Sequence, residues 1–531
     1  MDIVSNRTCE SEPGDVTAVL VVGGGLVGLS AALFLAWQGV PTILVERHAG
    51  SSPHPRAIGY TPRTLELLRA VGLADQVPQV DPSFRLRRAR VASLAGERFE
   101  ETPWTPSRDR GVIEQSPCTG AAIAQDRLEP MLRDRAIELG ADIRMETELV
   151  RLEQSDSGVA ALVRERSGRE YSIHASYVVA ADGHRSPVRG ALGLGRTGRG
   201  HIRTVRSVLF RAPLDEYLRD GVSQFSIDQP GFQAFLTTYG DGRWVLIFSD
   251  DDERDEATLR RLVARAIGRD DLPVEIVTTG RWEMSALIAD RFSVGRVFLA
   301  GDAAHTLPPS RGGFGANTGI EDVHNLAWKL AAVLAHKSEP VLLDSYDAER
   351  RPIAWLRHQQ IFARDDYKSV AAGVARDVEI LDDDAMEFGQ LYRSDVIVGA
   401  GPELPPAKRP EEWAGQPGTR APHTWLTVDG KRVSLLDLVP RRWTLVAGDG
   451  RWRSAVHGID GGPICLVVDR DLRNAGVASV RIALGIGDHG AVLIRPDGYI
   501  AWRATELPND PMARLGAALS TVCAAKEIAR A

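Results

Sequence analysis

Cysteine is scarce in this chain and is not arranged for chemistry. The 531 residues include four cysteines, at positions 9, 118, 465 and 523. No pair has the C-x-x-C spacing of thioredoxin-type redox sites or zinc ribbons. The scattered positions argue against a disulfide framework and indicate reduced thiols in a cytoplasmic protein.

Long apolar runs and an excess of basic charge are also missing. No stretch of about 18 apolar residues occurs, so we expect no membrane-spanning helix. The first 16 residues are polar and include acids, which argues against a signal peptide. A net charge of −7 makes nucleic acid an unexpected partner. The 12 histidines form no H-E-x-x-H motif or Cys/His cluster, so we predict no metal site.

Glycine, in contrast, is abundant, and a glycine-rich loop follows the first strand-like run. Residues 18–22 are apolar, and Gly23, Gly25 and Gly28 then form a G-x-G-x-x-G pattern. The first glycine permits a tight turn, the second lets a pyrophosphate approach the backbone, and the third lets helix and strand pack closely. Two later copies of the pattern lack the flanking strand and helix. We therefore expect a dinucleotide site at the first copy.

The residues beyond this loop complete the expected nucleotide site. Leu26 and Val27 begin the predicted helix, whose free N–H groups suit phosphate. A second strand-like run ends at Glu46, 18 residues after Gly28. This is close to the roughly 20-residue spacing at which an acid binds the adenosine ribose. Arg47 could favour a 2′-phosphate or be an ordinary surface arginine.

A second glycine-rich loop follows the apolar run 297–300. The run ends at Gly301 and Asp302, at the carboxyl end of a predicted buried strand, where open α/β sheets bind ligands. The Asp302 carboxylate can accept hydrogen bonds from ribose hydroxyls, and the glycine amides beyond it can approach a pyrophosphate or a ring edge. His305 is interpreted as a packing residue. A third strand-like run ends at Asp182-Gly183.

The order of the predicted elements indicates an α/β protein with several domains. Alternating strands and helices up to about residue 190 predict a mainly parallel sheet. An aromatic-rich region with glycine and aspartate turns then predicts an antiparallel sheet that could wall a cavity. Two long helices are expected, at about 320–337 and 342–366, and a proline-rich linker at 401–422. The expected parts are 1–190 and 286–395 for the nucleotide-binding domain, 191–285 for a middle domain, and 396–531 for the linker and a small α/β domain.

Together these motifs resemble the FAD-dependent aromatic hydroxylases, which are single-component flavoprotein monooxygenases. The resemblance covers about residues 17–390. The last part, with Arg495-Pro496-Asp497-Gly498-Tyr499, is similar to the thioredoxin-like extension of the phenol hydroxylase and aromatic polyketide hydroxylase branch. The resemblance implies a Rossmann-type FAD-binding domain, an antiparallel-sheet substrate domain and a C-terminal thioredoxin-like domain. Without C-x-x-C, that last domain is expected to act in packing or assembly.

The resemblance also implies roles for individual residues in binding FAD. The three glycines of the first loop would bind the pyrophosphate, Glu46 the adenosine ribose, and Asp302 the ribityl or pyrophosphate end. In the family, the Arg56 position contacts flavin, Gln125 starts a conserved type of helix, and Asp182 serves both FAD and nicotinamide. The other expected cofactor contacts are Pro309, Gly313, Gly315, Ala316 and Asn317, the last four against the isoalloxazine.

The implied reaction uses NADPH or NADH and O2 to hydroxylate a phenolic or polycyclic aromatic substrate through a flavin C4a-hydroperoxide. No catalytic side chain is assigned, because the cofactor carries the chemistry. The candidates for substrate contacts, each with a core or loop role as its alternative, are Tyr60, Phe225, Phe235, Tyr239 and Arg311.

Several alternatives stay open at the level of sequence. Natural-product biosynthesis on an aromatic polyketide-like compound is favoured over catabolism of simple phenols. Baeyer–Villiger oxygen insertion would use the same scaffold. A flavin-binding sequestration or sensor protein is the alternative from another class. A homodimer is as compatible with the sequence as a monomer.

Overall fold

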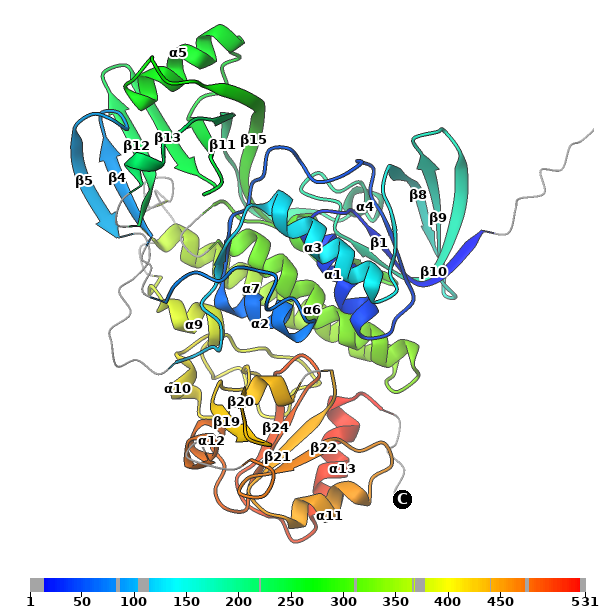
Figure 1. Ribbon diagram of the computed structural model, residues 1–531. Helices are drawn as coiled ribbons and strands as arrows, with labels where there is room; N and C mark the ends of the chain where they lie inside the picture. The colour runs from blue at the N-terminus through cyan, green and yellow to red at the C-terminus, as the bar shows by residue number, and fades with distance from the viewer. Residues whose placement is uncertain are drawn as a thin grey trace, which may run out of the picture.

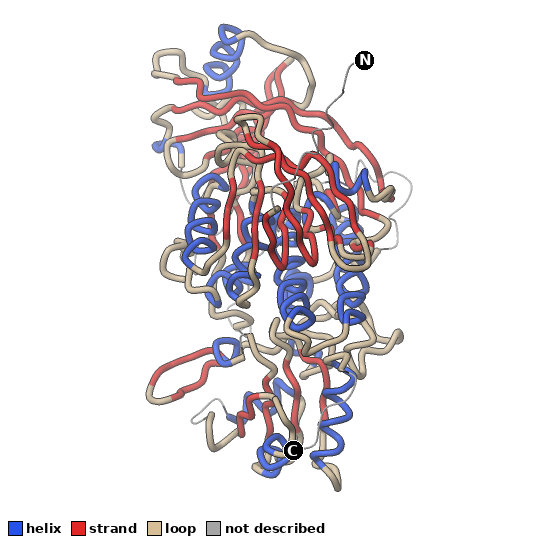
Figure 2. The backbone as a smooth tube through the Cα atoms, turned by 90° about the vertical axis from the view of Figure 1, so that its right-hand side faces the viewer, coloured by secondary structure: helices blue, strands red, loops and turns tan. Residues whose placement is uncertain are grey.

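The computed structural model describes residues 14–82, 86–103, 114–218, 221–309, 313–364, 367, 378–439, 441–472 and 477–525. Three larger sheets and two two-stranded ones organise these residues. Figure 1 shows the C-terminal four-stranded sheet lying below the central helices α2 (Pro62–Ala70) and α6 (Phe314–Leu334). In the view turned by 90°, the strands of the other two sheets occupy the upper half, and the C-terminal part stands apart beneath them (Figure 2). Arg311 lies outside the described residues.

The first sheet has the mainly parallel core that the sequence predicts. The strand order is β16-β17-β10-β1-β2-β7, and β8 and β9 extend it as an antiparallel pair beside the first half of β10. Strands β1, β2, β7, β10 and β17 are parallel. Their bounds are β1 (Asp15–Val22), β2 (Thr42–Val45), β7 (Asp142–Arg144), β8 (Thr147–Gln154), β9 (Val159–Glu165), β10 (Glu170–Ala180), β16 (Ser293–Val294) and β17 (Val297–Leu299).

Helices cover this sheet because its central strands are apolar on both faces. Helix α1 is buried along almost its whole length, since it lies against the sheet and also contacts α3 and α6. Two short strands, β3 (Gly59–Tyr60) and β6 (Ala121–Ala122), pair beside it. The helices of this part are α1 (Leu26–Trp37), α2 (Pro62–Ala70), α3 (Gln125–Glu138), α4 (Pro187–Ala191), η2 (Gly301–Ala303), α6 (Phe314–Leu334), η3 (Pro340–Leu343) and α7 (Asp344–Ala363).

Helix α6 begins six residues before the position that the sequence predicts. Gly313 precedes it in the left-handed conformation, and the helix runs from Phe314. Gly315 and Gly319, which disfavour helix in isolation, conceal the helical pattern of its first turns. The expectation of a start near Ile320 was therefore wrong, because tertiary packing outweighs the glycine propensity.

The second sheet is antiparallel apart from one pair. Its order is β18-β15-β11-β14-β13-β12-β4-β5, and β4 pairs with β12 in parallel. Helix α5 (Glu256–Ile267) packs on one face over an apolar core. Strands β4 and β5 come from an earlier part of the chain than the other strands of the sheet. The bounds are β4 (Arg87–Val91), β5 (Arg98–Pro103), β11 (Arg196–Arg211), η1 (Asp215–Tyr217), β12 (Val222–Gln229), β13 (Phe232–Thr238), β14 (Arg243–Phe248), β15 (Glu275–Ala289) and β18 (His305–Thr306).

The C-terminal part is a small four-stranded sheet between helices, as the resemblance to a thioredoxin-like domain implies. The order is β22-β21-β23-β24, with separate apolar cores on its two faces. Residues 401–422 join it to the rest by irregular chain that includes one short helix, α10, and Arg420 and Ala421 in this segment are buried. The elements from residue 383 onward are α9 (Asp383–Phe388), α10 (Pro410–Trp413), β19 (Trp425–Val428), β20 (Lys431–Ser434), η4 (Leu435–Leu438), β21 (Thr444–Ala447), α11 (Arg451–His457), β22 (Ile464–Val467), α12 (Val477–Leu484), β23 (Ala491–Ile494), β24 (Ile500–Ala504) and α13 (Pro511–Val522).

Helix α1 packs closely against two segments from much later in the chain. Gly301 has a φ of +58°, and a Cβ there would lie 2.7 Å from a methyl carbon of Val27. A Cβ at Gly319, in α6, would lie 2.5 Å from the same side chain. These glycines therefore allow the start of α1, the η2 turn and the first turns of α6 to meet. Among the described residues, no helix has both the length and the apolar character needed to cross a bilayer.

Replacing Gly28 with alanine is expected to disrupt the contact between α1 and β1. The new Cβ would lie 1.8 Å from the Gly23 carbonyl oxygen, so the helix would have to move away. We expect the free energy of unfolding to fall by about 3 kcal/mol or more. Urea unfolding followed by circular dichroism measures this change.

Gly516→Ala in α13 is the matched control, because no atom lies within 4 Å of its Cβ position. Alanine should raise stability there by up to about 1 kcal/mol through helix propensity. A Gly28→Ala protein as stable as the unchanged one would contradict the packing argument.

Candidate cofactor and substrate site

A large cavity lies where the carboxyl ends of the parallel strands face the inner side of the second sheet. Its volume is about 2020 Å³. A single small-molecule site usually occupies about 300–1,000 Å³, so this cavity has room for two ligands side by side. The expected site residues that line it are Gly23, Gly25, Leu26, Val27, Glu46, Arg47, Arg56, Tyr60, Gln125, Asp182, Phe235, Asp302, Pro309, Gly313, Gly315, Ala316 and Asn317.

The glycines of the first loop meet different steric needs. Gly23 has a φ of +103°, and a Cβ there would lie 2.4 Å from the Ala181 carbonyl oxygen. Gly25 has extended backbone, and a Cβ there would meet only a Glu129 oxygen, at 3.8 Å. The space in front of Gly25 is thus open, at the amino terminus of α1. This is the arrangement that lets a phosphate approach backbone N–H groups.

A buried carboxylic acid borders this open space. Glu129 is 2% exposed, and its Oε1 accepts a hydrogen bond of 2.7 Å from Gln125 Nε2. Burial raises its pKa, against the opposing effect of hydrogen bonds from Ser51, Gln125 and the Leu26 N–H.

Glu46 lies at the end of β2, as predicted, and its carboxylate organises the loop around it. Gly24 N–H donates to Oε2 at 2.6 Å, and His48 N–H donates to Oε1 at 2.8 Å. His48 Nδ1 also lies 2.5 Å from Oε1, so of the roughly four acceptor positions on the two oxygens one remains for a ribose hydroxyl. Arg47 is exposed at the same part of the cavity.

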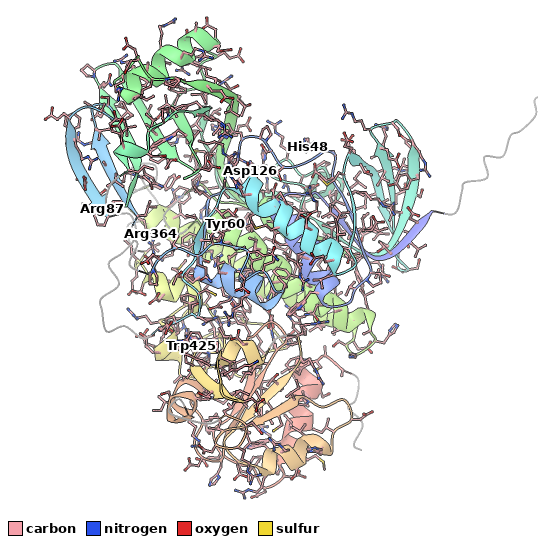
Figure 3. All side chains as sticks on the ribbon, in the orientation of Figure 1. His48, Tyr60, Arg87, Asp126, Arg364 and Trp425 are labelled. Carbon is pink, nitrogen blue, oxygen red and sulfur yellow. The ribbon has the colours of Figure 1, made fainter. Side chains whose placement is uncertain are left out.

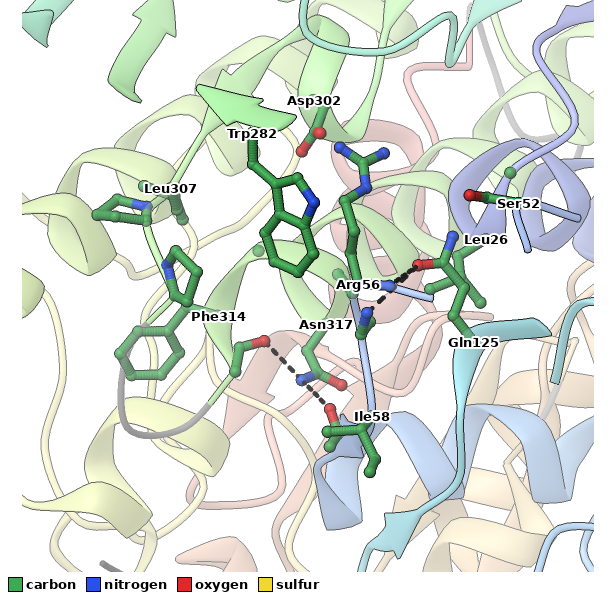
Figure 4. A pocket seen from close by; sticks show the side chains of 18 of the residues that line it. Leu26, Ser52, Arg56, Ile58, Gln125, Trp282, Asp302, Leu307, Phe314 and Asn317 are labelled. Carbon is green, nitrogen blue, oxygen red and sulfur yellow. Dashed lines mark hydrogen bonds between the residues drawn. The ribbon is translucent and has the colours of Figure 1, made fainter. Parts of the chain in front are cut away.

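Asp302 faces the cavity from the η2 turn, with no hydrogen bond from the protein to its carboxylate among the contacts of the described residues. Figure 4 shows it beside Trp282, with the Arg56 side chain pointing toward it. The amino terminus of α6, after Gly313, lies at the same cavity. Two helix amino termini, each with unpaired N–H groups and a partial positive charge, therefore serve one site.

Asp182 has a structural role that the sequence did not predict. Its carboxylate accepts hydrogen bonds from Ser186 Oγ at 2.6 Å and Val188 N–H at 3.0 Å, at the start of α4. Buried Arg189 then donates to the carbonyl oxygens of His184, at 3.0 Å, and Ala303, at 2.8 Å. Arg189 thereby ties the loop after β10 to the η2 turn that carries Asp302.

The side chains of Asn317 and Gln125 bind protein groups, although both residues line the cavity. Asn317 Oδ1 accepts from Thr64 Oγ1 at 2.7 Å, and its amide nitrogen donates to the Gly313 carbonyl at 2.8 Å. Gln125 Oε1 accepts from the N–H groups of Arg56 and Ala57, at 3.4 and 3.3 Å. Figure 4 draws contacts of both side chains. They shape the cavity by fixing the backbone beside it.

The second sheet contributes apolar side chains that the sequence analysis missed. Ile247 on β14 and Trp282 and Met284 on β15 line the cavity together with Phe235. Trp282 and Met284 stand two residues apart, so they share one face of the strand. The sequence predicts this alternation. It does not predict which face of β15 lines the cavity, because that depends on the relative placement of the two sheets.

The other candidate substrate contacts differ in their surroundings. Phe225 is fully buried in the core beneath α5 and does not line the cavity. Tyr239 is also outside the lining, and its hydroxyl donates to the Pro55 carbonyl at 2.5 Å. Tyr60 is 3% exposed, and its buried hydroxyl has no hydrogen-bond partner among the described residues. Figure 3 shows Tyr60 in the middle of the molecule, where the second sheet meets the central helices.

Comparison with known proteins shows which family the chain resembles along its whole length. A family model described as the FAD binding domain matches residues 16–360, and one described as the C-terminal region of aromatic-ring hydroxylases matches 414–525. The chain is 38% identical to tetracenomycin B2 monooxygenase-dioxygenase of Streptomyces olivaceus, covering 95% of this chain and 98% of the relative. It is 39% identical to 4-methyl-5-nitrocatechol 5-monooxygenase of a Burkholderia species, covering 97% and 99%.

Solved structures agree with these relatives. Aklavinone-11 hydroxylase, in a ternary complex with FAD and aklavinone, superposes with a TM-score of 0.86 at 34% identity, covering 96% of this chain and 100% of that one. The flavin-dependent monooxygenase PieE, in complex with FAD and substrate, gives 0.82 at 29% identity, covering 95% and 99%. The expected α/β fold, with its three-part organisation, is confirmed.

Gly25→Ala separates cofactor binding from folding. Its extended backbone suits alanine, so the stability of the apoprotein should change by less than about 1 kcal/mol. A methyl group in the open space should weaken FAD binding about tenfold or more, which corresponds to about 1.4 kcal/mol. Titration of the apoprotein with FAD, followed by flavin fluorescence, measures the Kd. An unchanged Kd would place the pyrophosphate elsewhere.

Proposed function

Because the chain belongs to the FAD-dependent aromatic-ring hydroxylases, we propose that this monooxygenase hydroxylates a fused-ring aromatic compound of the polyketide type. The observation that carries the proposal is the size of the cavity, about 2020 Å³, which extends from the glycine loops to the inner face of the second sheet. This volume is about twice the upper range of a single small-molecule site, so it suits a substrate of several fused rings beside the cofactor. Its lining by Phe235, Ile247, Trp282 and Met284 suits flat apolar rings.

The relatives point to two substrate classes. Two Streptomyces relatives are named for tetracenomycin B2 and aklavinone, whereas the Burkholderia relative is named for 4-methyl-5-nitrocatechol, a single substituted ring. Sequence identity does not separate them, since all three lie between 36% and 39%. Cavity volume favours biosynthetic hydroxylation of a polycyclic substrate, and a catabolic hydroxylase of simple phenols is the alternative.

The roles proposed for the cofactor-binding residues follow from the fit of the empty spaces to FAD. The open backbone at Gly25 and the amino terminus of α1 would bind the pyrophosphate. Glu46 would accept from the adenosine ribose, and Asp302 from the ribityl hydroxyls. The amino terminus of α6 would face the isoalloxazine. When bound, FAD supplies the activation of O2 with electrons from NADPH or NADH.

The chain's own contribution to the reaction is to orient the ring and exclude water. Trp282 and Met284 would cover one side of the substrate. Tyr60 would donate a hydrogen bond to an oxygen of a bound ligand. Burial raises the pKa of Tyr60 well above its ordinary value, so the hydroxyl keeps its proton at neutral pH.

Three further aspects belong to the same proposal. O2 is the oxidant, as the monooxygenase names of the relatives imply. The free cysteines Cys118, Cys465 and Cys523 support a cytoplasmic location. We retain four parts, with bounds 1–190, 191–285, 286–395 and 396–531. Strands β4 and β5, although they lie within the first range, belong to the sheet of the middle, substrate-binding part. A homodimer is the proposed alternative to a monomer.

Purified holoenzyme should oxidise NADPH or NADH faster when a suitable aromatic compound is added. We expect fused-ring phenols and quinones to give this acceleration and a product heavier by one oxygen, read by mass spectrometry. Hydrogen peroxide is measured in parallel, because an uncoupled ligand accelerates oxidation without product. Acceleration by simple phenols or nitrocatechols alone would favour the catabolic alternative, and a lactone product would indicate Baeyer–Villiger insertion.

Tyr60→Phe tests the unpaired hydroxyl. Removing a buried hydroxyl that has no partner should leave stability equal or slightly raised, because no hydrogen bond is lost. If the hydroxyl binds the substrate, KM should rise about three- to tenfold, the effect of one hydrogen bond of about 0.5–1.5 kcal/mol. Thermal unfolding and steady-state kinetics measure the two effects.

Tyr239→Phe is the control, since its hydroxyl is bonded to the Pro55 carbonyl. It should lower stability by about 1 kcal/mol and leave KM unchanged. The proposed role of Tyr60 fails if its variant loses stability while KM stays constant.

A further inference from the structure

Helix α7 carries two adjacent buried charges that face different parts of the protein. Glu349 is 1% exposed and Arg350 is 0% exposed. Glu349 binds residues of the C-terminal domain, and Arg350 binds the helix that supports the η2 turn. Two consecutive residues of one helix therefore connect the C-terminal domain with the turn that carries Asp302.

On the side of the C-terminal domain, Arg495 forms a two-pronged ion pair with Glu349. Arg495 Nη1 and Nη2 lie 2.7 and 2.9 Å from the two Glu349 carboxylate oxygens. Arg495 follows β23 in the Arg-Pro-Asp-Gly-Tyr motif, and Asp497 of the same motif accepts from its Nε at 3.0 Å. Lys329 Nζ also lies 2.8 Å from Glu349. The four side chains are buried and balance in charge.

On the side of the cofactor site, Arg350 holds Asp322. Arg350 Nε donates to Asp322 Oδ1 at 2.8 Å. Asp322 Oδ2 accepts from the Gly301 N–H at 3.3 Å and lies 2.6 Å from His305 Nε2. Asp322 therefore anchors the η2 turn at Gly301, immediately before Asp302, and again at His305 just after it.

A second connection runs through stacked tyrosines. Tyr392, in the segment between α9 and α10, stacks on Tyr499 with ring centroids 4.0 Å apart. The Arg350 guanidinium donates to the Tyr392 hydroxyl at 2.6 Å. The Arg495 guanidinium lies 5.9 Å from the centroids of both tyrosine rings. Arg350 thus contacts the C-terminal domain through Tyr392 as well as through its neighbour Glu349.

The charges in this network depend on one another because water does not reach them. Burial alone would raise the pKa of Asp322, but His305 and Arg350 outweigh it and bring the value to about 2. Likewise, burial opposes charge on Glu349, but Arg495 and Lys329 hold its pKa well below the ordinary range. Removing Arg495 leaves the buried carboxylates of Glu349 and Asp497 with Lys329 as the remaining cation of these four side chains, so the neighbouring side chains must rearrange.

We propose that Arg495 of the C-terminal domain is a positioning residue for FAD, acting through Glu349, Arg350 and Asp322 on the turn that carries Asp302. The inference rests on the proposed contact between Asp302 and the cofactor. The C-terminal domain has no C-x-x-C motif. Under this proposal, its role is to stabilise the position of the η2 turn at the cofactor site.

Arg495→Met is the decisive variant, because methionine fills much of the space without charge. We expect the Kd for FAD to rise tenfold or more, and the visible circular dichroism of bound flavin to change. Arg495→Lys keeps the positive charge but cannot form both hydrogen bonds to the Glu349 carboxylate. Its Kd and spectrum should therefore fall between those of Arg495→Met and the unchanged protein. An unchanged Kd and spectrum in either variant overturns the proposal, and Arg495→Lys decides alone if Arg495→Met does not fold.

Two controls separate positioning from general destabilisation. Asp437→Asn breaks the 2.8 Å ion pair with Arg69, which crosses the same boundary from α2 to η4 without joining the network. Leu519→Ala weakens the core of the C-terminal domain at α13. Both should bind FAD with unchanged Kd and spectrum, and an equal loss in Leu519→Ala would overturn the proposal.

Asp302→Ala distinguishes failure of this inference from failure of the cofactor placement. If Asp302→Ala binds FAD normally, the proposed contact of Asp302 with the cofactor is wrong. If Asp302→Ala weakens binding but Arg495→Met does not, the placement stands and the coupling through α7 is refuted.

Discussion

The cofactor site depends on the close approach of α1 to η2 and α6 around Val27. Gly301 and Gly319 have no side chain, and a Cβ at either would lie within 2.7 Å of Val27. This approach brings two helix amino termini and the Asp302 carboxylate to one cavity, although they come from segments nearly 300 residues apart. The groups proposed to bind the cofactor are therefore mostly backbone N–H groups, and their geometry is set by packing.

Much of this arrangement is predictable from sequence because it is locally encoded. Gly23, Gly25 and Gly28 follow a strand and open a helix, and Glu46 and Asp302 end later strands, so each motif carries its own context. The start of α6 is not predictable in this way, because Gly315 and Gly319 disfavour helix until packing against α1 demands them. Trp282 was missed because alternation along β15 gives two faces without saying which one meets the cavity.

The side chains that support the site are harder still to predict. Asn317 and Asp182 carry the residue types that bind ligands, yet both use hydrogen bonds to hold protein groups in place. For Asn317 this role depends on partners distant in sequence, Gly59 and Thr64. The charged residues on α7 could not be predicted to be buried either. In the sequence, Glu349 and Arg350 resemble an ordinary exposed pair, and only the fold buries them.

The contact between Arg495 and Glu349 has a consequence for biosynthesis of the chain on the ribosome. Domains generally form as they emerge, beginning at the amino terminus. The parallel sheet and its glycine loops are all translated by residue 334, but the arginine that neutralises Glu349 is made more than 140 residues later. If Arg495 positions the cofactor site as inferred above, the flavin pocket of the nascent protein gains its final support only after this arginine has been translated.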